Sequence, residues 1–419
     1  MASIMNPNLS LLQPYPFQKL STLLAGVTPD AGLRPISLSI GEPKHATPQF
    51  IRDVLVDALG GLSSYPATAG GEPLRKAISG WIERRYRIGA IDPATQVLPV
   101  NGSREALFAF AQAVVDTSKA RPVVVAPNPF YQIYEGAIVL AGAQPHFLSL
   151  LPDNGFALDL QQLPEEVWKR TQLIYVCSPG NPTGNVMTLD EWQALFELSD
   201  RHGFIIAADE CYSEIYFDES RPPLGALEAA QRLGRGDFRR LVAFSSLSKR
   251  SNVPGMRSGF VAGDAQILAK FLLYRTYHGC AMNPAIQTAS AAAWSDEKHV
   301  VENRRLYREK FEKTLAILSP VTGVNIPEAA FYLWLRTPIA DTEFAKQLFG
   351  QYNVTVVPGS YLARQAHGAN PGENFIRVAL VAPVEECLEA AQRLKAFYSQ
   401  FAKGKNKNDG SAVSHRQGI

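Results

Sequence analysis

The stretch SSLSKRSNVPGMRSG, residues 245–259, follows a short apolar run and is crowded with hydroxyls and glycines. It places Lys249 between Ser246 and Arg257, so that one amine lies among groups that bind anions. Gly255 and Gly259 leave room for a close backbone approach, because glycine has no Cβ. The stretch therefore predicts a lysine-containing anion site, with an exposed basic loop as the competing interpretation.

Outward from this stretch, short β-branched runs alternate with helical segments, which predicts an α/β fold. After the first run, apolar residues recur at helical spacing, which places a helix directly after residues 101–103. Beyond about residue 295, another helical stretch precedes strand-like runs and predicts a smaller α+β domain. The expected strands are 96–100, 122–126, 173–177, 204–208 and 241–244, then 331–335, 354–357 and 375–380.

These patterns divide the chain into four parts. Residues 1–35 are rich in proline and are expected to form an extended arm. Residues 36–294 form the expected large domain, and residues 295–403 the small one. Residues 404–419 hold only two large aliphatic side chains, Val413 and Ile419, and we expect this tail to be disordered.

Composition narrows the function. The 419 residues carry 41 basic and 39 acidic side chains, a net charge of +2, which favours neither nucleic acid nor an anionic membrane as partner. No apolar stretch approaches the roughly 18 residues of a membrane span, and no secretion signal is present, so a cytoplasmic protein is expected. Four scattered cysteines without a CxxC pair, and no HExxH motif, predict no metal site.

Two basic clusters are expected to be solvated surface. Arg304, Arg305, Arg308 and Lys310 lie opposite the apolar stripe of a predicted helix, and residues 84–87 read RRYR. Most lysine and arginine side chains are exposed, so neither cluster predicts a site.

Three further segments place polar groups at the ends of predicted strands. Gly102-Ser103-Arg104 opens a helix whose free N–H groups favour phosphate, although Ser103 could be an ordinary N-cap. Residues 178–184, SPGNPTG, contain an Asn-Pro turn. Asp209 and Tyr212 follow the run at 204–208, where Asp209 could equally cap a helix.

Together with residues 245–259, these segments resemble the class I/II aminotransferases, which are pyridoxal-phosphate enzymes of fold type I, and the resemblance covers about residues 9–400. It implies an α/β large domain with a mostly parallel central sheet and a smaller α+β domain. It also implies pyridoxal 5'-phosphate as cofactor, carried covalently by Lys249, whose freed amine then moves a proton.

The resemblance assigns further roles. Asp209 is expected beside the ring nitrogen, where a carboxylate keeps that nitrogen protonated and the ring able to accept electrons. Arg377 is expected to bind the substrate α-carboxylate through paired N–H groups. Tyr65 is expected to reach the phosphate of a neighbouring subunit, which implies a homodimer. The other expected cofactor-binding residues are Gly102, Ser103, Arg104, Tyr131, Asn181, Tyr212, Ser246 and Arg257.

Substrate choice depends on extra cations. Many relatives carry an acidic-aromatic pair where residues 41–45 read GEPKH, and Arg104 stands where Gln or Glu is frequent. Extra cations near a site favour extra substrate carboxylates. We expect Gly41, Lys44, Arg104 and Asn181 to join Arg377 in binding substrate. Arg275 or His278 is a further candidate, and solvated surface cations are the alternative.

The whole-chain pattern is similar to that of the bacterial succinyldiaminopimelate aminotransferases. The resemblance implies exchange of an amino group between N-succinyl-LL-2,6-diaminopimelate and 2-oxoglutarate in lysine biosynthesis. An aspartate, aromatic or alanine aminotransferase, or a C–S lyase on the same scaffold, is the alternative. A cofactor-sensing transcription regulator would need a DNA-binding module, for which the segment before Gly41 leaves no room.

Overall fold

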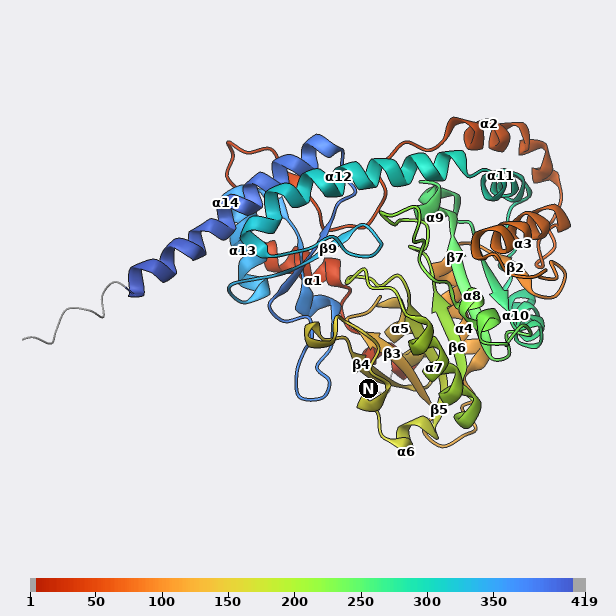
Figure 1. Cartoon of the computed structure of the whole chain (residues 1–419). Coiled ribbons are helices and arrows are strands. Elements are labelled where there is room, and N and C mark those ends of the chain that lie inside the picture. The colour runs from red at the N-terminus through yellow and green to blue at the C-terminus, as the bar shows by residue number, and fades with distance from the viewer. Residues whose placement is uncertain (1–4, 410–419) are drawn as a thin grey trace, which may run out of the picture.

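The computed structural model describes residues 5–409 and contains a large and a small domain (Figure 1). Its strands are β1 (Ile36–Ser37), β2 (Val97–Val100), β3 (Val123–Asn128), β4 (Gln144–Ser149), β5 (Thr171–Cys177), β6 (Ile205–Asp209), β7 (Leu241–Ser246), β8 (Gly259–Gly263), β9 (Tyr332–Arg336), β10 (Val354–Thr355), β11 (Val357–Pro358) and β12 (Phe375–Ala379). Its α-helices are α1 (Pro16–Leu24), α2 (Gln49–Asp57), α3 (Glu72–Tyr86), α4 (Ser103–Val114), α5 (Ile133–Leu140), α6 (Glu165–Trp168), α7 (Leu189–His202), α8 (Ala226–Arg232), α9 (Leu247–Arg250), α10 (Ala265–His278), α11 (Pro284–Ser295), α12 (Lys298–Thr322), α13 (Asp341–Tyr352) and α14 (Val384–Asp409).

The large domain is built on a seven-stranded sheet in the order β2-β8-β7-β6-β5-β3-β4. Strands β3 to β7 pair in parallel, and β8 runs antiparallel between β2 and β7. Alternate residues of the central strands enter different hydrophobic clusters, as with Ile174 and Val176 against Leu173 and Tyr175. Since side chains alternate between the faces of a strand, helices cover both faces of this sheet. The predicted mostly parallel α/β fold is confirmed.

Two strands of this sheet were not expected from the sequence. β4 reads QPHFLS and lies at the edge of the sheet, where one side of the strand stays unpaired and polar residues are tolerated. β8 reads GFVAG, and its two glycines hide the strand pattern. Both are recognised only through their pairing partners, because β propensity depends on sheet context.

The topology gathers polar residues at one edge. β7, β6, β5 and β3 are neighbours and run in parallel, so their carboxyl ends meet. These ends are Ser246, Asp209, Cys177 and Asn128. In open parallel sheets, ligands bind in the crevice outside these ends.

The small domain is an antiparallel sheet in the order β11-β12-β9, with α12, α13 and α14 packed in its core cluster. Strand β1 pairs with β10, and Ile36 lies in the same cluster. Residues 36–38 therefore belong to the small domain, not to the large domain as the boundary at residue 36 predicted. A two-residue strand is too short to show its partner by sequence pattern.

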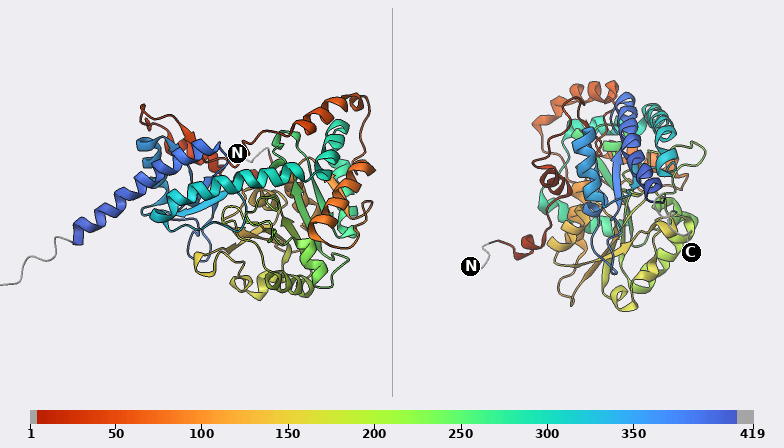
Figure 2. Two further views of the ribbon diagram at one scale, coloured as in Figure 1. Left: turned by 45° about the horizontal axis from the view of Figure 1, so that its top comes forward. Right: turned by 90° about the vertical axis from the view of Figure 1, so that its left-hand side faces the viewer.

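Both predictions for the chain ends need correction. The arm contains helix α1, which begins at Pro16, and proline is favoured at the first helical position because its missing N–H needs no partner there. Helix α14 continues to Asp409, beyond the expected limit at residue 403, since adding a turn to an anchored helix costs little (Figure 2). Residues 410–419 of the predicted tail lie outside the described residues.

The expectation that the basic clusters are solvated is also wrong for three residues. Arg304 and Lys310 on α12 are 4% and 1% exposed, and Arg85 on α3 is buried too. Arg85 and Arg304 both pair with Glu214, a residue far away in sequence. A helical stripe cannot reveal such a partner. Arg305 is exposed as expected.

Within residues 5–409, every helix is too short or too polar to pass through a bilayer.

Candidate active site

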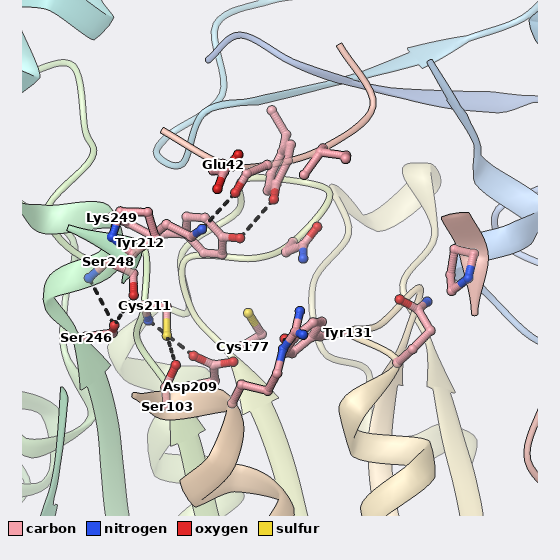
Figure 3. Close-up of a pocket in the computed structure, with 18 of the residues that line it drawn as sticks. Glu42, Ser103, Tyr131, Cys177, Asp209, Cys211, Tyr212, Ser246, Ser248 and Lys249 are labelled. Carbon is pink, nitrogen blue, oxygen red and sulfur yellow. Dashed lines mark hydrogen bonds between the residues drawn. The ribbon is translucent and has the colours of Figure 1, made fainter. Parts of the chain in front are cut away.

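A cavity of about 620 Å³ opens at the carboxyl edge of the large sheet, between the sheet and the small domain (Figure 3). Its floor comes from the ends of β5, β6 and β7, and its roof includes Tyr332 and Arg377 of the small-domain sheet. Tyr15, Pro16 and Phe17 of the N-terminal arm complete one side. Residues from distant parts of the chain thus meet at one place.

Lys249 lies in the cavity on the short helix α9, directly after β7. The Ser246 side chain caps this helix by accepting the N–H of Ser248, at 3.0 Å. The Lys249 amine donates a hydrogen bond to the Gly41 carbonyl at 2.7 Å. Burial lowers the pKa of Lys249 to about 8, because desolvation disfavours the ammonium form. The unprotonated amine, the form that acts as a nucleophile, is therefore more populated near neutral pH than in an exposed lysine.

Gly41 fits where no other residue would. A Cβ at this position would overlap the hydroxyl of Tyr332, so the backbone can lie against the cavity only because the residue is glycine. This close approach brings the Gly41 carbonyl within reach of Lys249.

An anion corner lies beside Lys249. Gly102 is the N-cap of α4 at φ +86°, a conformation that favours glycine, and the Arg257 guanidinium packs directly over it. Ser103 is the first residue of the helix and not its N-cap, because Gly102 takes the N-cap position. The Ser103 hydroxyl lies 2.8 Å from the Cys211 sulfur. A guanidinium, two serines and the N-terminus of α4 together suit a phosphate.

Asp209 ends β6 at the floor of the cavity and is 3% exposed. Its carboxylate accepts the Tyr134 hydroxyl at 2.6 Å and the Cys211 N–H at 3.2 Å. Burial raises its pKa, and in the described part of the chain no cation forms an ion pair with it. A buried carboxylate without a cation is costly, so the site is suited to a ligand that brings a positive charge.

Arg377 on β12 faces the cavity from the small domain. It donates to the Asn181 side-chain oxygen at 3.1 Å and to the Ser39 carbonyl at 2.9 Å. Its Nε is buried without an acceptor, and its guanidinium lies 4.5 Å from the Tyr332 ring centroid. The residue is held in place but carries no carboxylate partner among the described side chains, which leaves it free to bind a carboxylate ligand.

The remaining wall is aromatic. Tyr131 is within hydrogen-bond reach of the Arg104 Nε, and Arg104 lies over its ring. Opposite, the Tyr212 hydroxyl lies 2.9 Å from that of Tyr332. A flat ligand fits between such surfaces.

The cavity therefore fits pyridoxal phosphate: a reactive amine, an anion corner, an uncompensated buried carboxylate and an aromatic wall lie around one space. The family model described as "Aminotransferase class I and II" matches residues 34–394. The chain belongs to this family of pyridoxal-phosphate-dependent aminotransferases.

Relatives support the same class. An LL-diaminopimelate aminotransferase from Syntrophobacter fumaroxidans is 32% identical over 94% of this chain and 99% of its own. An aminotransferase structure from Neisseria meningitidis is 51% identical, covers 94% of this chain and 100% of its own, and superposes with a TM-score of 0.92. A probable N-succinyldiaminopimelate aminotransferase from Thermus thermophilus is 26% identical, covers 91% and 100%, and has a TM-score of 0.81.

Most residues expected at the site lie together. The cavity is lined by Gly41, Ser103, Arg104, Tyr131, Asn181, Asp209, Tyr212, Ser246, Lys249, Arg257 and Arg377, and Gly102 lies behind Arg257. Lys44 and Tyr65 do not line it. Lys44 pairs with Glu42 at 2.9 Å, and Tyr65 is fully exposed.

Arg275 is a wrong candidate for this cavity. Its guanidinium is buried and pairs with Glu105 at 2.8 Å, so it is not available to a ligand. His278 is exposed on the same helix, stacks on Tyr274 and does not line the cavity.

Sequence reasoning missed several lining residues. Tyr134, which does not line the cavity but donates to Asp209 from behind it, was also missed; it lies one helical turn after Tyr131, a spacing that could have marked it. Glu42 lies within the GEPKH segment, where the neighbouring Lys44 gives no indication of which of the two charges faces the cavity. Further examples are Tyr15, Phe17, Cys177 and Tyr332, which carry no motif signal.

Proposed function

We propose that the chain transfers an amino group from N-succinyl-LL-2,6-diaminopimelate to 2-oxoglutarate, giving N-succinyl-2-amino-6-oxopimelate and glutamate, in lysine biosynthesis. The observation that carries this proposal is Arg104. It lines the same cavity as Arg377, and among the side chains of the described chain no carboxylate pairs with it. A second unpaired guanidinium favours a substrate with a second carboxylate. The names of the diaminopimelate aminotransferases among its relatives support the same substrate class.

When bound, pyridoxal phosphate supplies an aldehyde and a ring that accepts electrons. Within the proposal, Lys249 carries it and, once freed by the substrate amine, moves a proton to and from the substrate α-carbon. Asp209 keeps the ring nitrogen protonated, and Tyr134 holds the Asp209 carboxylate in place through its 2.6 Å hydrogen bond. Asn181 and Tyr212 face the phenolic oxygen.

The other proposed roles concern phosphate, ring and substrate. Gly102, Ser103, Ser246 and Arg257 would hold the phosphate, and Tyr131 would stack on the ring. Arg104, which the resemblance also places near the phosphate, serves the distal carboxylate in this proposal. Arg377 binds the α-carboxylate through two N–H groups, while its bond to Asn181 orients it. Tyr332 and Arg377 reach the cavity from the small domain, whereas its floor belongs to the large domain. Closure of the cavity around the substrate would therefore exclude water.

At the mouth, Glu42 requires a specific account. Its carboxylate lines the cavity and would repel a substrate carboxylate, but Lys44 pairs with it and lowers its pKa. The role proposed for Lys44 is therefore to neutralise Glu42, or to bind a distal carboxylate when that pair opens. Arg104 is the more direct candidate, since it lies in the cavity.

A second substrate, unsuccinylated LL-diaminopimelate, is favoured by Glu42 itself. The distal end of this molecule carries an ammonium as well as a carboxylate, and Glu42 and Arg104 supply one opposite charge for each. Curated relatives at 32% identity carry this activity in their names. The two substrates differ at the distal nitrogen, which is a neutral amide in one and an ammonium in the other.

Kinetics with both diaminopimelates and with glutamate test the assignment. Arg104→Met is expected to lower kcat/KM about 10- to 100-fold with the multi-carboxylate substrate and much less with a monocarboxylate amino acid. Glu42→Gln is expected to spare the succinylated substrate and to weaken the unsuccinylated one. Equal losses on all substrates with Arg104→Met would refute the distal role. Release of ammonia and pyruvate without an oxo acid would instead identify a lyase.

We also propose a homodimer in which Tyr65 contributes to the partner's phosphate site. Tyr65 is fully exposed, and Leu59 and Leu62 beside it are 48% and 58% exposed, an apolar surface that an interface would cover. Sedimentation should give twice the chain mass of 45.9 kDa. Tyr65→Ala should weaken cofactor retention about tenfold if its hydroxyl binds phosphate. A monomer with normal activity would refute both statements.

A further inference from the structure

Helix α12 carries a buried lysine that the proposed chemistry does not use. Lys310 is 1% exposed, and its amine contacts the His45 Nε2 at 3.0 Å and lies 4.9 Å from the Tyr307 ring centroid. In the described chain no carboxylate forms an ion pair with it; Cys387 of α14 is the titratable group that faces it from that helix, and Glu302 of α12 faces His45. A buried amine with so little compensation is costly, so its retention calls for a function.

The hydrogen bonds that connect Lys310 to Lys249 have a defined order of donors and acceptors. Since Lys310 donates to Nε2, the proton of a neutral His45 is on Nδ1, which donates to the Asn303 side-chain oxygen at 2.8 Å. Asn252 donates to the same oxygen at 3.1 Å. The Asn303 amide then donates to the main-chain carbonyl of Lys249 at 3.3 Å. Each step thus has one donor and one acceptor.

The same chain of contacts reaches Lys249 by a second path. His45 lies in the segment 41–45, whose first residue is Gly41. The Gly41 carbonyl accepts the Lys249 amine at 2.7 Å. Fixing His45 therefore fixes the segment that holds the amine, while Asn303 holds the backbone of the same lysine.

We propose that Lys310 and His45 are positioning residues for Lys249: through Asn303 and the 41–45 segment they hold both the backbone and the amine of the reactive lysine. Helix α12 runs from the small domain, beside α14, to the large domain, near α11 (Figure 1). This helix therefore links the small domain to the hydrogen bonds around Lys249. The role does not depend on which diaminopimelate is the substrate.

The test compares Lys310→Met with Lys313→Met in the full-length, cofactor-loaded enzyme. Lys313 lies on the same helix but is exposed and pairs with Glu309, at 2.6 Å, so its variant controls for loss of a lysine. The readouts are the pH titration of the cofactor absorption band, which reports protonation at the Lys249 nitrogen, and kcat and KM separately. Lys310→Met should move the midpoint by about half a pH unit or more and lower kcat about tenfold, with KM nearly constant.

Substitutions of His45 distinguish positioning from packing. His45→Phe keeps a ring against Tyr307, at 4.5 Å between centroids, but removes both hydrogen bonds, and should reproduce the Lys310→Met result. His45→Gln keeps one acceptor and one donor and should stay near the parent enzyme. The proposal would be overturned if Lys310→Met and His45→Phe had the same titration midpoint and the same kcat as Lys313→Met. It would also be overturned if His45→Gln lowered kcat as much as His45→Phe does. If Lys310→Met does not fold, the His45 pair gives the answer alone.

Discussion

The floor and the mouth of the cavity differ in how far their charged side chains are exposed to solvent. At the floor, Asp209 is buried at the end of a central strand and is held by a tyrosine hydroxyl and a main-chain N–H. At the mouth, Arg104, Glu42 and Lys44 are exposed charges on segments outside the sheet. A rigid, desolvated floor strengthens electrostatic effects on the reacting atoms, whereas an exposed mouth can change with little effect on folding. The proposed function thus places chemistry and substrate choice in different parts of the cavity.

The largest test of this separation is Lys249→Ala. If Lys249 both carries the cofactor and moves the proton, its loss should lower turnover on the order of 10⁴- to 10⁶-fold with every amino donor, because the group acts in several steps. Rapid-quench single turnovers with glutamate and with a diaminopimelate would measure this. Normal turnover, or a loss confined to one amino donor, would contradict the proposal that Lys249 acts in the reaction of every donor.

Asp209→Asn should have the next largest effect. An amide cannot hold a protonated ring nitrogen, so kcat should fall about 100- to 1000-fold, again for all donors alike. The neutral side chain can still accept from Tyr134, so the fold should remain intact. Steady-state kinetics, with circular dichroism as the control for folding, would check this; an unchanged kcat would argue against the ring-nitrogen role.

Arg377→Met should lower kcat/KM about 100-fold for all amino acids, since every one carries the α-carboxylate. Arg377→Lys keeps the charge but not the paired N–H groups, and should recover only part of the loss. This contrasts with Arg104→Met, whose effect should depend on the substrate. A substrate-dependent loss at Arg377 would place the distal carboxylate there instead.

The smallest effect concerns stability at the floor. Glu210 next to Asp209 accepts from the Tyr86 hydroxyl and from the Ala226 N–H, and burial raises its pKa from 4.5 to about 7. Its contribution to stability is therefore fully present below pH 4.5 and is lost as the pH rises through 7, on the order of 3 kcal/mol.

Urea unfolding of Glu210→Gln at several pH values would measure this contribution. In the parent protein, titration of Glu210 should lower the unfolding free energy between pH 4.5 and 8, and in Glu210→Gln this decrease should be absent. Glu309→Gln, on the surface of α12, serves as the control. Parallel pH profiles for Glu210→Gln and the parent protein would show that Glu210 does not titrate in this range.

The sequence predicts much of the floor and less of the mouth. The expected strand runs at 173–177, 204–208 and 241–244 agree closely with β5, β6 and β7, and each is followed by a polar residue of the cavity. Buried parallel strands read as continuous apolar runs, so their ends are easy to locate. Lys44 and Arg275 were paired with substrate on charge alone, but their partners are Glu42 and Glu105. Charge in a sequence does not show which counter-charge lies nearby.

By itself the sequence determined the α/β class and the polar residues at the strand ends, because these are local patterns of periodicity and turn chemistry. The role proposed for Lys249 rests on the resemblance to a family. Only the tertiary structure decided that Tyr134 supports Asp209, that Gly41 accepts from Lys249 and that Lys310 is buried against His45. The physical reason is that burial and hydrogen-bond partners depend on segments far apart in the chain; His45 and Lys310, for example, are 265 positions apart. Such partners meet only when both domains have folded.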